Sequence, residues 1–116
     1  MYGIDEIQII LGILVSDCKQ LFGDKLVDVR LFGSYARGDH SEHSDIDVMI
    51  ILNMERSEAR KYLSRVCKLA SEIDLKYDVV ISPVIRSNHD YNMFKERPGF
   101  YNNVMREGVS VIAAAG

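Results

Sequence analysis

The sequence has no tryptophan and only two prolines and two cysteines in 116 residues. Cys18 and Cys67 are too few for a disulfide framework, and both fall in segments with helical spacing, so we expect reduced, buried thiols in a cytoplasmic protein. No stretch rich in proline and glycine suggests a linker, and the length is that of one compact domain, so we expect a single domain over residues 1–116. The first residues do not resemble a signal peptide, and their apolar run is too short and interrupted to span a bilayer.

An excess of positive charge is also lacking. There are 14 basic and 17 acidic residues, which gives a formal net charge of -3. Proteins that bind duplex nucleic acid usually carry a basic face that neutralises phosphates, so stable duplex binding is disfavoured. Two phosphate-binding motifs are missing as well, the P-loop and the glycine loop of kinases with its partner signatures.

Hydrophobic periodicity predicts helices and strands in the order α-β-β-α-β-α-β. Period-3.6 spacing marks helices and alternation or short apolar runs mark strands; the predicted helices are 4–22, 56–75 and 99–107, the predicted strands are 26–32, 45–52, 77–85 and 109–112, and residues 87–98 read as irregular. This order predicts an α+β fold, with a small mixed β-sheet of about four strands and helices packed mainly on one face. The apolar stripe of the first helix is wide, so Ile9, Ile13 or Val15 either joins the core or meets a partner.

The most informative motif is Gly33-Ser34, followed after ten residues by Asp45-Ile46-Asp47. Glycine at the end of a strand allows a backbone to approach a phosphate closely. Ser34 adds a hydroxyl and a backbone N–H at the start of a helical turn, which suits phosphate oxygens. Arg37 can add a charge-assisted contact to a triphosphate, or it can be an ordinary exposed charge.

Three carboxylates form the candidate catalytic and metal-binding set. Asp45 and Asp47 are two residues apart on a predicted strand, so their side chains should point to the same face. Hard cations such as Mg²⁺ would neutralise such a pair. Asp78 begins the next predicted strand, and if the two strands are neighbours it completes a cluster able to hold two magnesium ions. If Asp78 is not the third acid of the site, Asp74 is the nearest alternative.

With its Gly-Ser, ten-residue spacing and Asp-x-Asp, the segment GSYARGDHSEHSDIDVMI resembles the polymerase-beta-type nucleotidyltransferases, and more narrowly the minimal nucleotidyltransferase domains of prokaryotes. The resemblance extends over nearly the whole chain, with Asp78 matching the family's third acid. It implies transfer of a nucleoside monophosphate, here AMP from ATP, to a hydroxyl. It also implies an antitoxin role beside a HEPN-type RNase toxin, with a tyrosine of that partner as one acceptor.

Three functions remain open at this point. The first is an adenylyltransferase that modifies a HEPN-type partner. The second is a nucleotidyltransferase for small molecules of the aminoglycoside kind, for which a homo-oligomer could supply the missing wall of the pocket. The third is a binding protein that masks a toxin and performs little catalysis. His40 and His43 lack the spacing of zinc ligands and are expected to be solvated.

Overall fold

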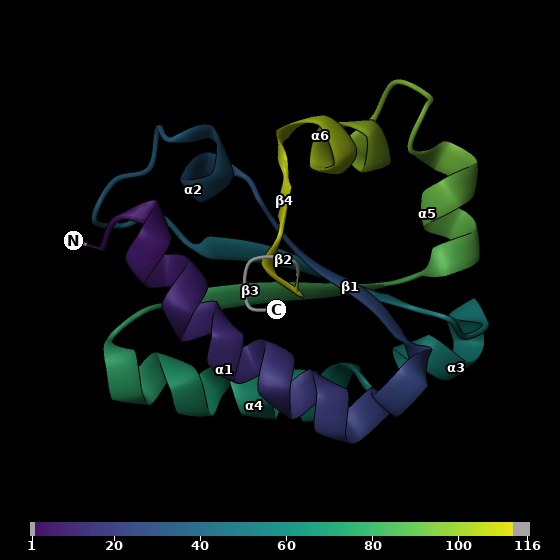
Figure 1. Cartoon of the computed structure of the whole chain (residues 1–116), viewed down its shortest axis with the longest axis horizontal. Helices are drawn as coiled ribbons and strands as arrows, with labels where there is room; N and C mark the ends of the chain where they lie inside the picture. Colours follow the sequence, from purple (N-terminus) through teal and green to yellow (C-terminus); the bar gives the residue numbers. More distant parts are fainter. Residues whose placement is uncertain (1, 113–116) are drawn as a thin grey trace.

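The computed structural model describes residues 2–112, which form one layered α+β unit (Figure 1). Local sequence accounts for the first two elements. Helix α1 (Ile4–Phe22) has acids in its first turn, and strand β1 (Leu26–Phe32) alternates between buried and more exposed residues. A short 3-10 turn, η1 (Gly23–Lys25), joins them. Both regular elements agree with the predicted ranges, because their periodicity is strong and uninterrupted.

The sheet has four strands in the order β3-β2-β1-β4. The central strand β2 (Ile46–Leu52) runs antiparallel to β1 and parallel to β3 (Ile81–Ser87). The two-residue strand β4 (Val109–Ser110) adds to the other edge of β1. The predicted mixed sheet is therefore confirmed, and its parallel pair requires the crossover through α3 (Arg56–Arg60) and α4 (Leu63–Tyr77).

The main hydrophobic core lies between the sheet and the pair of helices α1 and α4, which run below the sheet in Figure 1. Strands β1 and β2 contribute alternate residues to this face, and the buried members are Val29, Leu31, Ile46, Val48, Ile50 and Leu52. Residues between them point to the opposite face, because strand side chains alternate. The position of each β2 side chain is thereby fixed, including that of Asp47.

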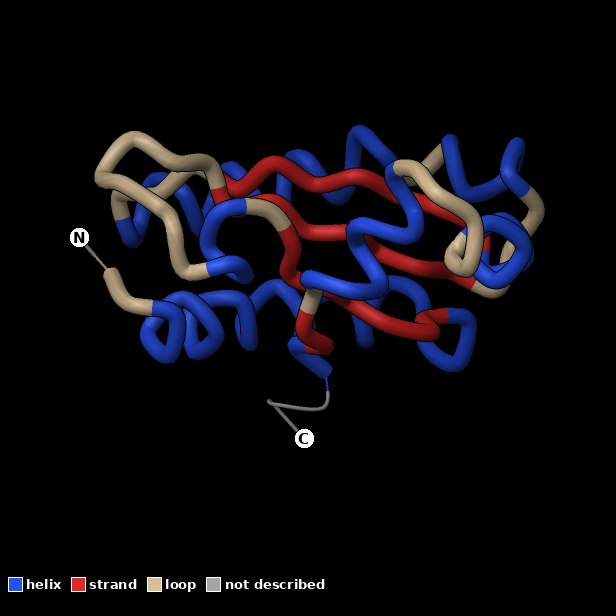
Figure 2. The backbone as a smooth tube through the Cα atoms, turned by 90° about the horizontal axis from the view of Figure 1, so that it is seen from above, coloured by secondary structure: helices blue, strands red, loops and turns tan. Residues whose placement is uncertain are grey.

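The opposite face is only partly covered. Helices α5 (Asn88–Phe94) and α6 (Phe100–Glu107) pack over one end of it, around a small second core of Met49, Ile51, Tyr91 and Val104. Figure 2, which looks onto this side, shows strands left uncovered by the helices. Short helix α2 (Ser34–Arg37) stands beyond the end of β1, away from α5. The helices thus pack mainly on one face, as predicted.

Several predicted boundaries were wrong. The helix expected over 56–75 is two helices, α3 and α4, and the second continues to Tyr77. The strand expected over 77–85 is displaced to Ile81–Ser87. The segment expected to be irregular contains α5, which begins where the Ser87 hydroxyl accepts a hydrogen bond from the Asp90 N–H. The last strand ends at Ser110 rather than at residue 112.

Side-chain burial corrects the expectation for the cysteines and decides between the two alternatives for α1. Cys18 is buried, whereas Cys67 is exposed on α4, so only one of the two thiols belongs to the core. In α1, Val15 is buried and Ile13 packs against the core, whereas Ile9 is 75% exposed. Within residues 2–112 no helix has both the length and the apolar character needed to cross a membrane.

Candidate active site

The site begins where β1 ends. Gly33 has φ 76° and ψ -154°, a backbone conformation that is essentially restricted to glycine. A Cβ atom at Gly33 would overlap the Oδ2 atom of Asp47 and lie 3.2 Å from its Cγ. Glycine therefore serves two purposes, because it permits the turn and lets the Asp47 carboxylate rest against the backbone.

Asp47 lies on the partly covered face of the sheet. Its register partners are Phe32 in β1 and Ser82 in β3, so these three side chains form a row across the sheet. Asp45 precedes β2 by one residue and is exposed, whereas Asp47 is partly buried. The pairing of the two carboxylates at a metal stays a prediction, and the two groups interact electrostatically.

The charge of Asp45 raises the pKa of Asp47, although burial is the larger cause of that increase. The positive charge of Arg37 acts in the opposite direction and lowers the pKa of Asp47. Two carboxylates so close to each other, one of them partly desolvated, are costly as a pair of anions. A hard cation between them would remove this cost, and Mg²⁺ prefers carboxylate oxygens. The pair therefore fits a magnesium ion.

The Gly-Ser segment leads directly into α2. The first hydrogen bond of this helix runs from the Arg37 N–H to the Gly33 carbonyl, at 3.0 Å, so the N–H groups of Ser34, Tyr35 and Ala36 precede it. The Arg37 side chain bonds to Asp39 at 3.2 Å and to Glu107 of α6 at 3.3 Å. These two acidic partners raise the pKa of Arg37, which remains cationic beside the carboxylate pair.

The structure does not place Asp78 in the predicted position. Asp78 terminates α4 in the left-handed conformation, with φ 56° and ψ 53°, and its N–H donates to the Asp74 carbonyl. It therefore does not begin β3, whose first residue is Ile81. In residues 2–112 no three acidic, histidine or cysteine side chains come together as a metal site, so the expected cluster of Asp45, Asp47 and Asp78 is not formed.

Asp74, the alternative acid, has a structural partner. Its Oδ1 atom accepts a hydrogen bond of 2.9 Å from the N–H of Ile81, at the start of the edge strand β3. Burial raises the pKa of Asp74, the Ile81 hydrogen bond lowers it, and the charge of Asp45 raises it further. Asp74 thus interacts with the charge of Asp45 while its carboxylate accepts the hydrogen bond at the start of β3.

A cavity of about 580 Å³ lies beside the carboxylates, at the end of the sheet. Its walls include Tyr35, Ser44, Asp78 and Val80, but neither Asp45 nor Asp47. His40, expected to be solvated, instead stacks on Tyr35 with ring centroids 4.1 Å apart. The His40 Nδ1 atom is buried and lacks a hydrogen-bond partner among the described residues.

Sequence reasoning missed the residues that flank the acids. Phe32 and Ser82 were not singled out, although β1 alternation placed Phe32 opposite the core-facing Leu31. Arg30, also on this face, donates to the carbonyls of Val104, Met105 and Gly108, so it attaches the end of α6 to the sheet. No signal in the sequence indicated these long-range contacts.

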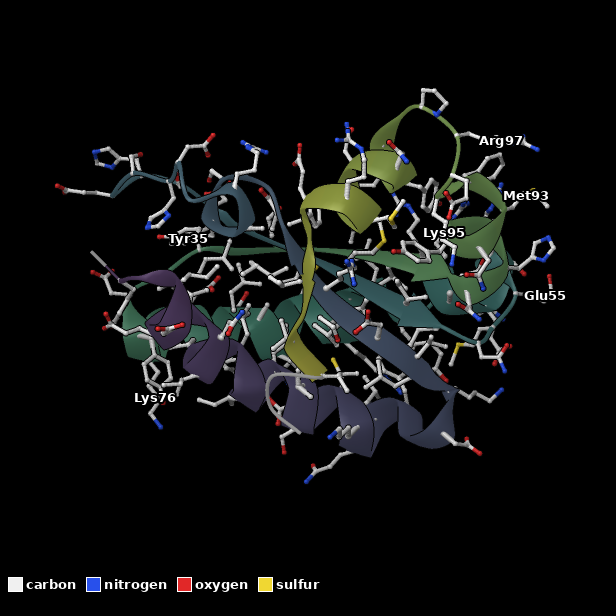
Figure 3. All side chains as sticks on the ribbon, turned by 45° about the horizontal axis from the view of Figure 1, so that its top comes forward. Tyr35, Glu55, Lys76, Met93, Lys95 and Arg97 are labelled. Atoms are coloured by element: carbon white, nitrogen blue, oxygen red, sulfur yellow. The ribbon has the colours of Figure 1, made fainter. Side chains whose placement is uncertain are left out.

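The segment after β3 lies away from the carboxylates. Lys95 and Arg97, which belong to the segment expected to be irregular, stand with Met93 at the opposite end of the molecule from Tyr35 (Figure 3). Their cationic groups lie over aromatic rings, with Lys95 5.7 Å from the Tyr91 centroid and Arg97 5.5 Å from that of Phe94. These basic side chains therefore support the α5 region rather than the Gly-Ser turn.

The site thus consists of a glycine-serine turn against Asp47, with Asp45 nearby, on a small mixed sheet backed by two helices. The chain belongs to the nucleotidyltransferase domain family, whose model matches residues 11–111. The resemblance to minimal nucleotidyltransferases stated from the sequence is thereby confirmed.

Individual relatives agree with this assignment. The chain is 46% identical over 69 residues to "Putative protein adenylyltransferase MJ0141" of Methanocaldococcus jannaschii, a match covering 60% of this chain and 68% of that protein. It is 35% identical over 94 residues to MJ0604 of the same organism, a protein with the same descriptive name, covering 81% of this chain and 86% of the relative. It is 26% identical to "Protein adenylyltransferase MntA" of Thermococcus cleftensis over 83% of this chain and 94% of that protein.

A solved structure shares the fold. The crystal structure of "a putative nucleotidyltransferase from Sulfolobus solfataricus" superposes with a TM-score of 0.59 at 18% identity, over 95% of this chain and 86% of the other. At this identity the likeness concerns the arrangement of helices and strands alone.

Proposed function

We propose that this protein is a magnesium-dependent adenylyltransferase that moves AMP from ATP to a hydroxyl group of a partner protein. The observation that carries the proposal is the contact between Gly33 and Asp47, in which a glycine-only turn holds the phosphate-binding segment against a carboxylate pair. The names of the M. jannaschii and T. cleftensis relatives support a protein as the acceptor. The antitoxin role, the HEPN-type toxin as partner and a tyrosine as the acceptor residue rest on the family resemblance.

In the proposed site each group has one task. Asp45 and Asp47 would hold the magnesium ion, which when bound neutralises negative charge on the triphosphate and polarises its phosphoryl oxygens. Gly33 and Ser34 would bind phosphate oxygens through the backbone N–H groups and hydroxyl at the start of α2. Arg37 would add positive charge beside them, although it must share its guanidinium with Asp39 and Glu107.

The reaction itself is a substitution at phosphorus. The acceptor hydroxyl oxygen bonds to the α-phosphorus of ATP, the bond from that phosphorus to the bridging oxygen breaks, and pyrophosphate leaves. The hydroxyl proton passes to solvent. Asp78 is not assigned a step, because it caps α4 and does not lie in the strand beside the pair.

One observation favours a second candidate, a binding protein that masks its partner with little catalysis. The described part of the chain holds no third carboxylate, imidazole or thiolate with Asp45 and Asp47 in a metal-binding group. A two-carboxylate site binds a metal–triphosphate but supplies fewer groups to the reaction. The small-molecule acceptor has no comparable support, because neither Asp45 nor Asp47 lines the cavity at the end of the sheet.

The test combines binding with transfer. Magnesium and ATP together should raise the melting temperature of the wild type more than ATP alone, because ligands that bind only the folded state stabilise it. The double variant Asp45→Asn, Asp47→Asn should lose this shift, and the exposed acid of η1 gives the matched control Asp24→Asn, which should keep it. Label from α-phosphate-labelled ATP should appear on a HEPN-type partner with the wild type and not with the double variant.

The two candidate functions give different results in that experiment. Magnesium-dependent ATP binding with labelled partner establishes the transferase. Partner binding without label, unchanged in the double variant, establishes masking instead. If the double variant retains the full magnesium–ATP shift, the site has been placed wrongly.

A further inference from the structure

The parallel pairing of β2 and β3 shows which residue stands beside the acidic pair. Ile46 is registered with Ile81 and Asp47 with Ser82, and the Ile46 N–H donates to the Val80 carbonyl at 2.8 Å. The hydrogen-bonded ladder therefore reaches Val80. One step back from the Ile46–Ile81 pair, the residue beside Asp45 is Val80.

Alternation along the chain shows which face Val80 occupies. Val79 and Ile81 both pack in the main core, on the side of α1 and α4. The side chain between them points to the other side, because successive strand residues alternate, and this is the side of Asp47. Exposure agrees, since Val80 is 56% exposed whereas Ile81 is buried at 5%.

In the strand beside β2, this is the position from which a third carboxylate would face the pair; the nearby Asp74 already accepts the hydrogen bond of the Ile81 N–H. Neighbouring strands lie about 4.8 Å apart, so an acidic side chain opposite Asp45 would reach the same ion. Asp78 is two residues earlier, but the left-handed turn that ends α4 removes it from the strand. Ser82, opposite Asp47, offers a hydroxyl rather than a charge.

We propose that Val80 occupies the place of the third carboxylate, so that this chain holds the metal–triphosphate through Asp45 and Asp47 alone and transfers its nucleotide slowly. This inference rests on the proposed function, because it concerns the same metal ion. Val80 is an apolar residue that is 56% exposed beside the two acids, so burial in the core does not account for it. Val80 borders the cavity at the end of the sheet, so a carboxylate there would have space.

The experiment introduces the carboxylate and measures magnesium binding. Magnesium is titrated at fixed ATP into the wild type and the variants Val80→Asp and Val80→Asn, and the concentration for half of the melting-temperature shift is recorded. Val80→Asp should lower this concentration by about tenfold, on the order of 1.4 kcal/mol. Val80→Asn, which has the same size without the charge, should leave it near the wild-type value. Single-turnover transfer should also become faster in Val80→Asp alone.

A further measurement without metal checks that Val80→Asp folds and that the new charge is where we expect it. In magnesium-free buffer Val80→Asp should melt below Val80→Asn, because a third anion is added to the pair, and magnesium should remove this difference. The inference is overturned if both variants gain magnesium affinity equally, or if Val80→Asp gains none. A loss of transfer in Asp78→Asn overturns it too, because Asp78 would then be the third acid. If the wild type itself fails to bind magnesium and ATP, it is the proposed function that fails.

Discussion

Replacing Gly33 by alanine tests the geometric basis of the site. The backbone at Gly33, with φ 76° and ψ -154°, is a conformation that costs a residue with a Cβ about 1–3 kcal/mol. The added Cβ would also overlap Oδ2 of Asp47, and overpacking of this kind costs about 1–3 kcal/mol more. The two costs together are about 2–6 kcal/mol, so at roughly 4 °C per kcal/mol for a domain of this size Gly33→Ala should lower the melting temperature by about 8–24 °C.

Gly38 provides the matched control. It also has a positive φ, of 84°, but an added Cβ would meet nothing within 4 Å. Gly38→Ala should therefore be destabilised only by the cost of its left-handed backbone conformation. This cost is about 1–2 kcal/mol, or roughly 4–8 °C in melting temperature. The difference between the two variants therefore combines the overlap with Asp47 and the larger conformational cost at Gly33.

Thermal melts with and without magnesium and ATP complete this test. Removing the Asp47 carboxylate in the double variant Gly33→Ala, Asp47→Ala should recover part of the stability lost in Gly33→Ala, because the overlapping atoms are gone. Gly33→Ala should also lose most of the magnesium–ATP shift, because Asp47 is displaced. The reasoning would be refuted if Gly33→Ala melted at the same temperature as Gly38→Ala, or if it kept the full melting-temperature shift with magnesium and ATP.

Three more predictions follow from single contacts. Burial and the charge of Asp45 raise the pKa of Asp47, so the ionised carboxylate destabilises the fold at neutral pH. This destabilisation disappears as the pH falls through the raised pKa. Without magnesium, Asp47→Asn should therefore melt about 1–3 °C above the wild type at pH 7, and the difference should shrink in acid. Arg30→Met leaves three carbonyls at the end of α6 without their donor, so melts should show a loss of about 2–3 kcal/mol and hydrogen exchange should quicken in α6. Burial, with a smaller contribution from Asp17, raises the pKa of Cys18 to about 12. A thiol reagent should therefore label only Cys67 in the native protein and both cysteines after unfolding. Rapid labelling of both cysteines in the native protein would contradict this structure.

Local patterns in the sequence determined much of the fold and the first part of the site. The ranges of α1 and β1 follow from periodicity that holds over many residues, so neighbouring structure had little to alter. The spacing from Gly33-Ser34 to Asp45 and Asp47 also belongs to the sequence alone, because a turn after one strand and two alternate residues of the next form a local pattern. Helix α5 escaped prediction because its seven residues are mostly polar, and it is held by tertiary packing of Tyr91 against Met49 and Ile51.

The tertiary structure decided which residues lie beside the two carboxylates. Where β3 begins depends on the end of α4, since Asp78 takes a left-handed turn and the Asp74 carboxylate binds the first N–H of the strand. A shift of the strand start by a few residues changes which side chains stand beside β2. Here Asp78 lies outside the strand, and Val80 stands beside Asp45. The sequence contains both residues, but register is a long-range property, fixed by the packing of Ile46 and Ile81 in the core between the sheet and helices α1 and α4.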